Sequence, residues 1–139
     1  MDVHGSMGRF FLIALLMACL ASPAMAYYHS SDTNRDYAIN LSELLRVIQF
    51  FNSAGYHCQT GTEDSFAPGT GDHGCTPHDS DYNPQDWGVN LSELLRVIQF
   101  FNTLGYHTQC DSEDTFAPGP GAHDPCGPEG EGVQEGEGN

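Results

Sequence analysis

The chain has 139 residues, with 4 Lys and Arg against 19 Asp and Glu, which gives a formal net charge of −15. Phosphate backbones and anionic membrane surfaces repel such a polyanion, so the charge argues against nucleic-acid binding and favours a cation as small partner. The length fits one small domain or two very small ones, and it leaves no room for a catalytic domain of ordinary size. We therefore do not expect an enzyme.

The N-terminal segment is predicted to be an export signal. Residues 10–20 form an apolar run of 11 residues, whereas a membrane-spanning helix needs about 20. A small-x-small cleavage site ends at Ala26, so residues 1–26 have the organisation of a secretory signal peptide. The residues before Cys19 also resemble a lipoprotein box, which leaves lipidation at Cys19 as an alternative. Either interpretation predicts a secreted or cell-surface protein, with no transmembrane segment after signal cleavage.

The segment Asp32–Glu43, here called loop 1, carries oxygen-bearing side chains at a regular spacing. Counted as 12 positions, it has them at positions 1, 3, 5, 9 and 12, and position 7 can offer its backbone carbonyl. Ca²⁺ takes about six to eight oxygen ligands, and this spacing can turn them towards one point. Ile39 at position 8 is predicted to pair with its counterpart in a second loop through a short backbone bridge. The metal-free alternative is a solvated acidic loop that ends in a helix cap.

A helix is predicted directly after this loop. The apolar positions 41, 44, 45, 48 and 51 follow the i, i+3, i+4, i+7 pattern of an amphipathic helix. Asn40 can cap its N-terminus, with Glu43 three residues later as the partner in a capping box. Gly55 is predicted as the C′ glycine that ends the helix, with Tyr56 folding back on the last turn.

The second half of the chain repeats the first. At an offset of 50, residues 37–73 match residues 87–123 at 25 of 37 positions, and NLSELLRVIQFFN recurs unchanged at 90–102. Such self-similarity indicates two copies of one supersecondary unit. Loop 2, Asp81–Glu93, is one residue longer than loop 1. Its oxygen-bearing side chains can still converge if Pro84 and Gln85 bulge outwards.

The cysteines follow the repeat. Removal of Cys19 with the signal leaves four, for which three pairings exist. The simplest joins Cys58 to Cys75 and Cys110 to Cys126 within their own copies, and export favours oxidation. A Cys/His zinc site is the alternative, although no C-x-x-C spacing occurs. The stretches 62–69 and 112–119 are predicted to be turns, anchored to the helices by Phe66 and Phe116.

The loop followed by its helix resembles an EF-hand-like calcium motif, and specifically half of a type I dockerin. It also resembles the SELLRVIQFFN-type repeats of exported bacterial proteins. The likeness covers residues 32–52 and 81–102, about a third of the chain. It implies a small all-α fold, loop-rich and disulfide-stapled, in which two calcium loop-helix repeats pack antiparallel. The predicted division is a signal peptide (1–26), repeat 1 (27–77), repeat 2 (78–126) and a disordered Gly/Glu-rich tail (127–139).

The resemblance also implies a ligand set and a role. Loop 1 departs from the family at position 6, where Tyr37 replaces the preferred Gly, and no enzyme is attached to the module. The implied function is calcium binding that organises a protein-interaction surface, with a cohesin-like or other extracellular protein as partner. The alternative is a structural cell-surface or spacer repeat that disulfides hold together with little or no calcium. The implied Ca²⁺ ligands are Asp32, Asn34, Asp36, Ala38 (backbone), Asn40 and Glu43 in loop 1, and Asp81, Asn83, Asp86, Gly88 (backbone), Asn90 and Glu93 in loop 2.

Overall fold

The computed structural model describes residues 26–126. The predicted signal peptide, except for its last residue, and the predicted tail at 127–139 lie outside the described residues. So does Cys19, the alternative lipidation site.

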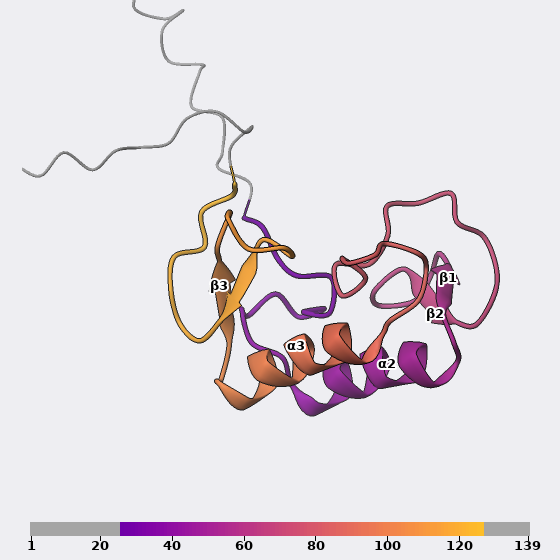
Figure 1. Cartoon of the computed structure of the whole chain (residues 1–139), viewed down its shortest axis with the longest axis horizontal. Coiled ribbons are helices and arrows are strands. Elements are labelled where there is room, and N and C mark those ends of the chain that lie inside the picture. The colour runs from indigo at the N-terminus through magenta and orange to yellow at the C-terminus, as the bar shows by residue number, and fades with distance from the viewer. Residues whose placement is uncertain (1–25, 127–139) are drawn as a thin grey trace, which may run out of the picture.

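Each repeat contains one helix, α2 at Leu41–Asn52 and α3 at Leu91–Asn102. Both begin with the predicted capping box. The side chain of Asn40 or Asn90 accepts a hydrogen bond from the backbone N–H of the glutamate three residues later, and the carboxylate of that glutamate accepts one from the backbone N–H of the asparagine. The two helices lie side by side and run in opposite directions (Figure 1). The helices and the antiparallel arrangement therefore follow the sequence-based expectation.

The expectation of an all-α fold is wrong, because each helix is followed by a small antiparallel hairpin. In repeat 1, β1 (Tyr56–Cys58) pairs with β2 (Phe66–Pro68) to form hairpin 1. In repeat 2, β3 (Tyr106–Thr108) pairs with β4 (Phe116–Pro118) to form hairpin 2. Strands of three residues are too short to show the alternation that reveals a strand in a sequence. The stretches predicted as turns thus contribute the second strand of each hairpin.

The ends of the helices explain how the chain enters the hairpins. The residue in the left-handed region after α2 is Ala54, with φ 55°, so the predicted C′ role of Gly55 is wrong by one residue. Gly55 has φ 141°, and a Cβ there would come within 2.8 Å of the Trp87 carbonyl oxygen. A side chain at position 55 would therefore push loop 2 away from hairpin 1.

The two repeats share one core. Phe66 and Phe116 are buried, which confirms them as the anchors of their loops. Ile39 and Val89 are also buried, but within the described residues no backbone hydrogen bond joins them, so the predicted bridge is wrong. The core consists of Ile39, Leu44, Val47, Phe50, Tyr56, Phe66, Val89, Leu94, Val97, Phe100, Tyr106 and Phe116.

Two histidines interlock the repeats at the centre of this core. His29 and His78 are 1% and 0% exposed. The ring of His29, from repeat 1, lies 5.5 Å from that of Phe100 in repeat 2. The ring of His78, from repeat 2, lies 5.4 Å from that of Phe50 in repeat 1. Each repeat therefore inserts its first segment into the other.

Both predicted disulfides are confirmed. Cys58 is bonded to Cys75 and Cys110 to Cys126, at sequence separations of 17 and 16. Each ties its hairpin to the segment that follows it. Disulfides of this kind persist in oxidising compartments, which indicates an extracellular environment. They also remove the thiolates that the alternative zinc site would need.

Candidate functional site

Loop 1 is organised around the carboxylate of Asp32, which is 3% exposed. Its Oδ1 accepts a hydrogen bond from Asp36 N (3.1 Å) and its Oδ2 one from Tyr37 N (2.9 Å). Tyr37 adopts φ 61°, so a tyrosine takes up the left-handed conformation for which calcium loops use Gly at position 6. The departure at this position leaves the sharp turn intact.

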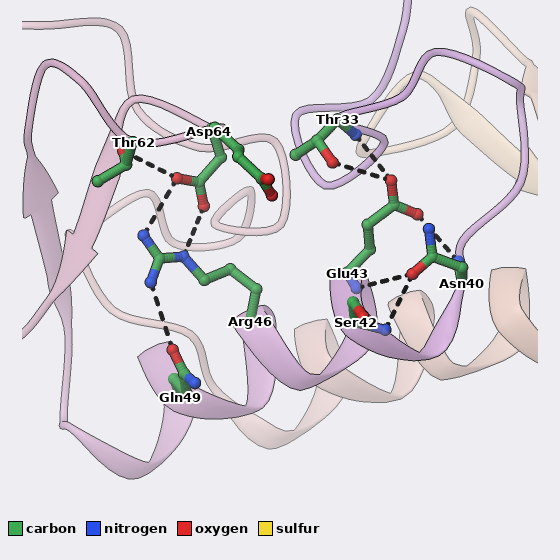
Figure 2. Close-up of a pocket in the computed structure, with 9 residues that line it drawn as sticks. Thr33, Asn40, Ser42, Glu43, Arg46, Gln49, Thr62 and Asp64 are labelled. Carbon is green, nitrogen blue, oxygen red and sulfur yellow. Dashed lines mark hydrogen bonds and ion pairs between the residues drawn. The ribbon is translucent and has the colours of Figure 1, made fainter.

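The carboxylate of Glu43 closes the other end of loop 1. It projects from the first turn of α2 into the loop and is 5% exposed. Its Oε1 accepts from the backbone and the hydroxyl of Thr33 (2.9 and 3.0 Å), and its Oε2 accepts from Asn40 N (2.9 Å). A pocket of about 520 Å³ lies beside this carboxylate, between loop 1 and the turn of hairpin 1 (Figure 2).

Loop 2 has the same plan despite its extra residue. Asp81 and Glu93 are 0% and 1% exposed. Asp81 accepts from the backbone N–H groups of Asp86 and Trp87 (3.0 and 2.8 Å), and Glu93 accepts from three backbone N–H groups. Pro84 is exposed, so the extra length is taken up at the surface. The Gln85 side-chain amide donates to the Asp81 carbonyl oxygen (3.2 Å), at the start of the loop.

The middle ligand positions differ between the loops. In loop 1 the Asn34 side-chain amide donates to Asp36 Oδ2 (3.0 Å), which places the predicted position 3 and position 5 ligands together. In loop 2 the Asn83 amide instead faces Glu113 Oε1 (3.4 Å), from the turn of hairpin 2. The position 3 and position 5 side chains are thus hydrogen-bonded to each other in loop 1, whereas in loop 2 the Asn90 amide donates to the Asn83 carbonyl oxygen (3.3 Å).

A tyrosine from the opposite repeat reaches each loop. The hydroxyl of Tyr106 donates to Asp32 Oδ2 (2.7 Å) and that of Tyr56 to Asp81 Oδ2 (2.7 Å). Burial and these bonds raise the pKa of both tyrosine hydroxyls above the ordinary value. The sequence had indicated only helix-end packing for these tyrosines. Their recurrence in Gly-Tyr-His at 55–57 and 105–107 is the signal that could have found them.

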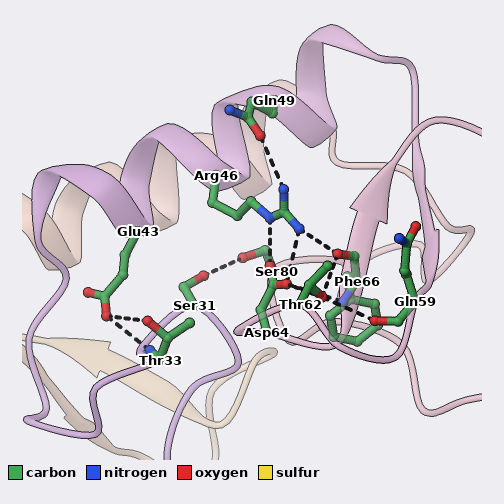
Figure 3. A network of polar contacts seen from close by, with 10 residues as sticks. All are labelled: Ser31, Thr33, Glu43, Arg46, Gln49, Gln59, Thr62, Asp64, Phe66 and Ser80. Carbon is green, nitrogen blue, oxygen red and sulfur yellow. Dashed lines mark hydrogen bonds and ion pairs between the residues drawn. The ribbon is translucent and has the colours of Figure 1, made fainter.

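Two of the three arginines of the described region pair with carboxylates outside the loops, and the third, Arg35 in loop 1, lies over the Tyr28 ring (5.9 Å to its centroid). Arg46 pairs with Asp64 (2.8 Å) and Arg96 with Asp114 (2.9 Å); the first pair also contacts Thr62 and the Phe66 carbonyl (Figure 3). Burial is the largest single effect on Asp64 and opposes its charge, but the hydrogen bonds from Arg46 and from the Phe66 backbone, with the charge of Arg46, together outweigh it, so the pKa of that carboxyl lies below its usual value. Arg96 has the same effect on the pKa of Asp114.

Consequently, four buried carboxylates lack a basic partner. Within residues 26–126, no salt bridge reaches Asp32, Glu43, Asp81 or Glu93. Buried charges in proteins are normally paired with an opposite charge or coordinate a metal. Here the N–H and O–H donors satisfy hydrogen bonding but carry no full positive charge.

The donor set of the loops suits a hard cation. A carboxylate has room for about four contacts; Asp32, Asp81 and Glu93 each accept three hydrogen bonds, and Glu43 accepts four. The arrangement is not a closed cage, however. In the described part of the chain no three His, Cys, Asp or Glu side chains form a cluster that could hold a metal ion. Calcium would therefore also need the amide and carbonyl oxygens of the loop.

Comparisons of the chain with protein-family models, with curated proteins and with solved structures find no match. The dockerin-like resemblance thus depends on the loop and helix residues alone. No helix within residues 26–126 has the length and apolarity needed to cross a membrane.

Replacement of Tyr106 by Phe tests the contact between the repeats. The substitution leaves the buried Asp32 carboxylate without one donor. It also removes the acceptor of the backbone N–H of His29, which bonds to the same hydroxyl (3.0 Å). We expect Tyr106→Phe to lower the free energy of unfolding by about 2–3 kcal/mol, measured by urea denaturation.

Tyr56→Phe should cost a similar amount, since its two bonds are equivalent. Tyr82→Phe is the control, because its hydroxyl makes no hydrogen bond within the described residues. An effect of Tyr106→Phe no larger than that of Tyr82→Phe would contradict this assignment.

Proposed function

We propose that the chain is an exported calcium-binding module of dockerin-like loop-helix repeats that presents a protein-interaction surface. The observation that supports the proposal is the pair of buried carboxylates in each loop, which no basic side chain of the described region neutralises. A bound divalent cation would supply the missing positive charge. The proposal assigns no catalysis to the chain. The residues that would hold calcium are Asp32, Asn34, Asp36, Ala38 (backbone), Asn40 and Glu43, and Asp81, Asn83, Asp86, Gly88 (backbone), Asn90 and Glu93.

The backbone of the loops supports the same proposal. Tyr37 and Trp87 both have positive φ, 61° and 66°, at the point where a calcium loop turns sharply. Tyrosine and tryptophan reach this region only at a cost of roughly 1–2 kcal/mol each. The turn that a calcium loop needs is therefore compatible with both loops, although equivalent positive-φ pairs also occur outside them, at Ala54 and Leu104 and at Ser65 and Thr115.

A second candidate is a structural spacer module that needs little or no calcium. It is favoured by the hydrogen bonds that every one of the four carboxylates already receives, and by the two disulfides. In this alternative the glutamates act as helix caps and as internal acceptors for the loop backbone. The two candidates differ in one measurable property, the affinity for Ca²⁺.

Calcium titration of two matched variants separates the candidates. Glu43→Gln keeps an acceptor for the cap but loses a charge and is a poor bidentate ligand. Because the position 3 and position 5 side chains are hydrogen-bonded to each other in loop 1 but not in loop 2, we expect Glu43→Gln to abolish the tighter of two calcium transitions in isothermal titration. Glu93→Gln should remove only the weaker one.

Asp111→Asn serves as the control, since it removes the same charge from an exposed position outside both loops. Wild-type binding by Glu43→Gln would mean that Glu43 is only a cap and that the loop 1 assignment is wrong. The implied partner, a cohesin-like or other extracellular protein, can be tested by capture on the immobilised chain with and without a chelator.

A further inference from the structure

The cavity beside loop 1 is lined by residues that repeat 2 carries again with one large difference. This cavity, here called the loop 1 pocket, has a volume of about 520 Å³ and lies between loop 1, the start of α2 and the turn of hairpin 1 (Figure 2). Seven of its nine lining residues recur unchanged in repeat 2. The two exceptions are Thr62, which is replaced by Ser112, and Thr33, which is replaced by Tyr82.

Thr33 and Tyr82 hold the same position in the two loops. Each directly follows the aspartate that begins its loop. Each also donates its backbone N–H to the glutamate that ends the loop, Thr33 to Glu43 Oε1 (2.9 Å) and Tyr82 to Glu93 Oε1 (3.0 Å). The two side chains therefore start from equivalent backbone positions. A small hydroxyl side chain in repeat 1 stands where repeat 2 has a phenol ring.

The partly buried side chain of Tyr82 lies among the charged groups that match the walls of the loop 1 pocket. Burial and the Asp114 carboxylate raise the pKa of its hydroxyl, and the neighbouring Arg96 lowers it. Glu93 and Glu113 are the other two charged neighbours, and both raise it. The counterparts of these four residues in the pocket are Asp64, Arg46, Glu43 and Glu63. Repeat 2 thus shows that such a lining accepts an uncharged phenol ring.

The loop and the hairpin turn are linked in repeat 2 by a contact that differs in repeat 1. The Asn83 amide faces Glu113 (3.4 Å), in the turn of hairpin 2. The Asn34 amide donates instead to Asp36 (3.0 Å), within its own loop. The space between loop 1 and its hairpin turn is the cavity, whose volume lies within the range of about 300–1,000 Å³ of small-ligand sites.

The walls of the loop 1 pocket are held in place by the protein itself. Arg46 is bound by Asp64 (2.8 Å) and by the Phe66 carbonyl (Figure 3), and Glu43 accepts four hydrogen bonds. A ligand that enters therefore orders little of the protein, which lowers the cost of binding. Because three carboxylates face one guanidinium in the lining, an anionic ligand is repelled and a neutral one is accepted.

We propose that the loop 1 pocket binds the phenol ring of a tyrosine side chain from a partner protein. The proposal rests on the proposed function in that it names the partner group of its interaction surface, but it does not require bound calcium. Tyrosine suits a pocket of mixed polarity because its ring is apolar and its hydroxyl is polar, and it is enriched among the residues that dominate interface energies. Phosphorylation of that tyrosine would add negative charge and oppose binding.

Titration with N-acetyl-L-tyrosinamide, followed by two-dimensional amide NMR of the full, disulfide-bonded chain, tests the proposal. This probe presents the ring between two peptide groups, as a protein does. We expect one saturable site with a dissociation constant on the order of 1 mM, in EDTA and in CaCl₂ alike, with the largest shifts at Thr33, Thr62 and Glu63. The phosphorylated form of the probe should bind at least tenfold more weakly.

Exchanges between the repeats make the test specific. Thr33→Tyr should fill the pocket with the chain's own ring and abolish probe binding. Tyr82→Thr should open a second site and raise the stoichiometry from one to two. Both changes introduce a residue that the other repeat already holds at this position, so the fold should persist, as the same spectra show. Thr70→Tyr adds the ring at an exposed position outside the pocket and should bind the probe like wild type.

Three results would overturn the proposal. They are a wild-type chain without saturable shifts at the pocket, unchanged probe binding by a folded Thr33→Tyr variant, and a folded Tyr82→Thr variant that still binds one equivalent. The outcome is separable from that of the proposed function. A chain that binds calcium but not the probe contradicts only the ring site, and a chain that binds the probe but not calcium contradicts only the calcium sites.

Discussion

Acidification from pH 7 to pH 5 in the presence of a chelator is expected to lower the stability of the chain by about 2 kcal/mol or more. The cause is the pair of histidines in the shared core. His29 Nδ1 accepts from Ser31 N and His78 Nδ1 accepts from Ser80 N (both 3.1 Å), so each neutral ring carries its proton on Nε2. A second proton on either ring would break that bond and place a charge among aromatic side chains.

The surroundings of the two rings set the direction of the effect. Burial lowers the pKa of both histidines, and the neighbouring His29 adds to the lowering at His78, whose pKa is about 3. Asp32, Asp79 and Asp114 oppose the lowering at His29, and Arg96 adds to it. Asp64 and Asp79 oppose it at His78, and Arg46 adds to it. Burial outweighs the carboxylates at both sites.

The pH window follows from these pKa directions. Both folded-state pKa values lie below the unfolded value of about 6.5, so the unfolded chain binds more protons below that pH. The contribution of the histidines is complete above about pH 6.5 and is lost as the pH falls towards the folded-state pKa values. Each proton is worth about 1.4 kcal/mol per pH unit. The His78 proton over about 1.5 units gives about 2 kcal/mol, and His29 adds a loss of the same sign.

Urea denaturation between pH 7 and pH 5 measures this slope. His29→Asn/His78→Asn is the matched variant, because an Asn side chain can accept the same bond from the residue two positions on and does not titrate. This variant should be less stable at pH 7 but nearly insensitive to pH over the window. His57→Gln/His107→Gln, at partly buried positions in the hairpins, should keep the wild-type slope. A wild-type stability that is flat from pH 7 to pH 5 would contradict the role given to the core histidines.

Local features of the fold were accessible from the sequence. The exact repeat of NLSELLRVIQFFN specified both helices and their Asn caps, because helical periodicity and capping chemistry are properties of neighbouring residues. The cysteine pairing followed from the repeat as well. The hairpins were missed because their three-residue strands depend on backbone pairing across a loop, for which so short a segment leaves no periodic signal.

The site shows the same division between local and long-range information. The positions of Asp32 and Glu43 could be found from their spacing within one loop. Their contacts with the opposite repeat could not, since Tyr106 and Asp32 are 74 residues apart. The core role of His29 is likewise a tertiary property, because nothing in the local pattern distinguishes a buried histidine from an exposed one.

Calcium is expected to have a large effect on thermal stability. With affinities near the range of extracellular calcium modules, about 10⁻⁴–10⁻³ M, calcium at about 10 mM stabilises the folded state by roughly 1.4–2.7 kcal/mol per site. Two sites together give roughly 3–5 kcal/mol. For a domain of about 100 residues, this corresponds to a rise in the unfolding midpoint of roughly 10–30 °C. The physical origin is the neutralisation of the buried carboxylates in each loop.

The most direct test is therefore a comparison of thermal unfolding midpoints at pH 7, in EDTA and in about 10 mM CaCl₂. The chain with both disulfides intact should melt roughly 10–30 °C higher in calcium, and the double variant Glu43→Gln/Glu93→Gln should show little or none of this rise. MgCl₂ at the same ionic strength controls for screening of the acidic surface. An unchanged wild-type midpoint in calcium would contradict the calcium proposal and leave the structural spacer as the function of this chain.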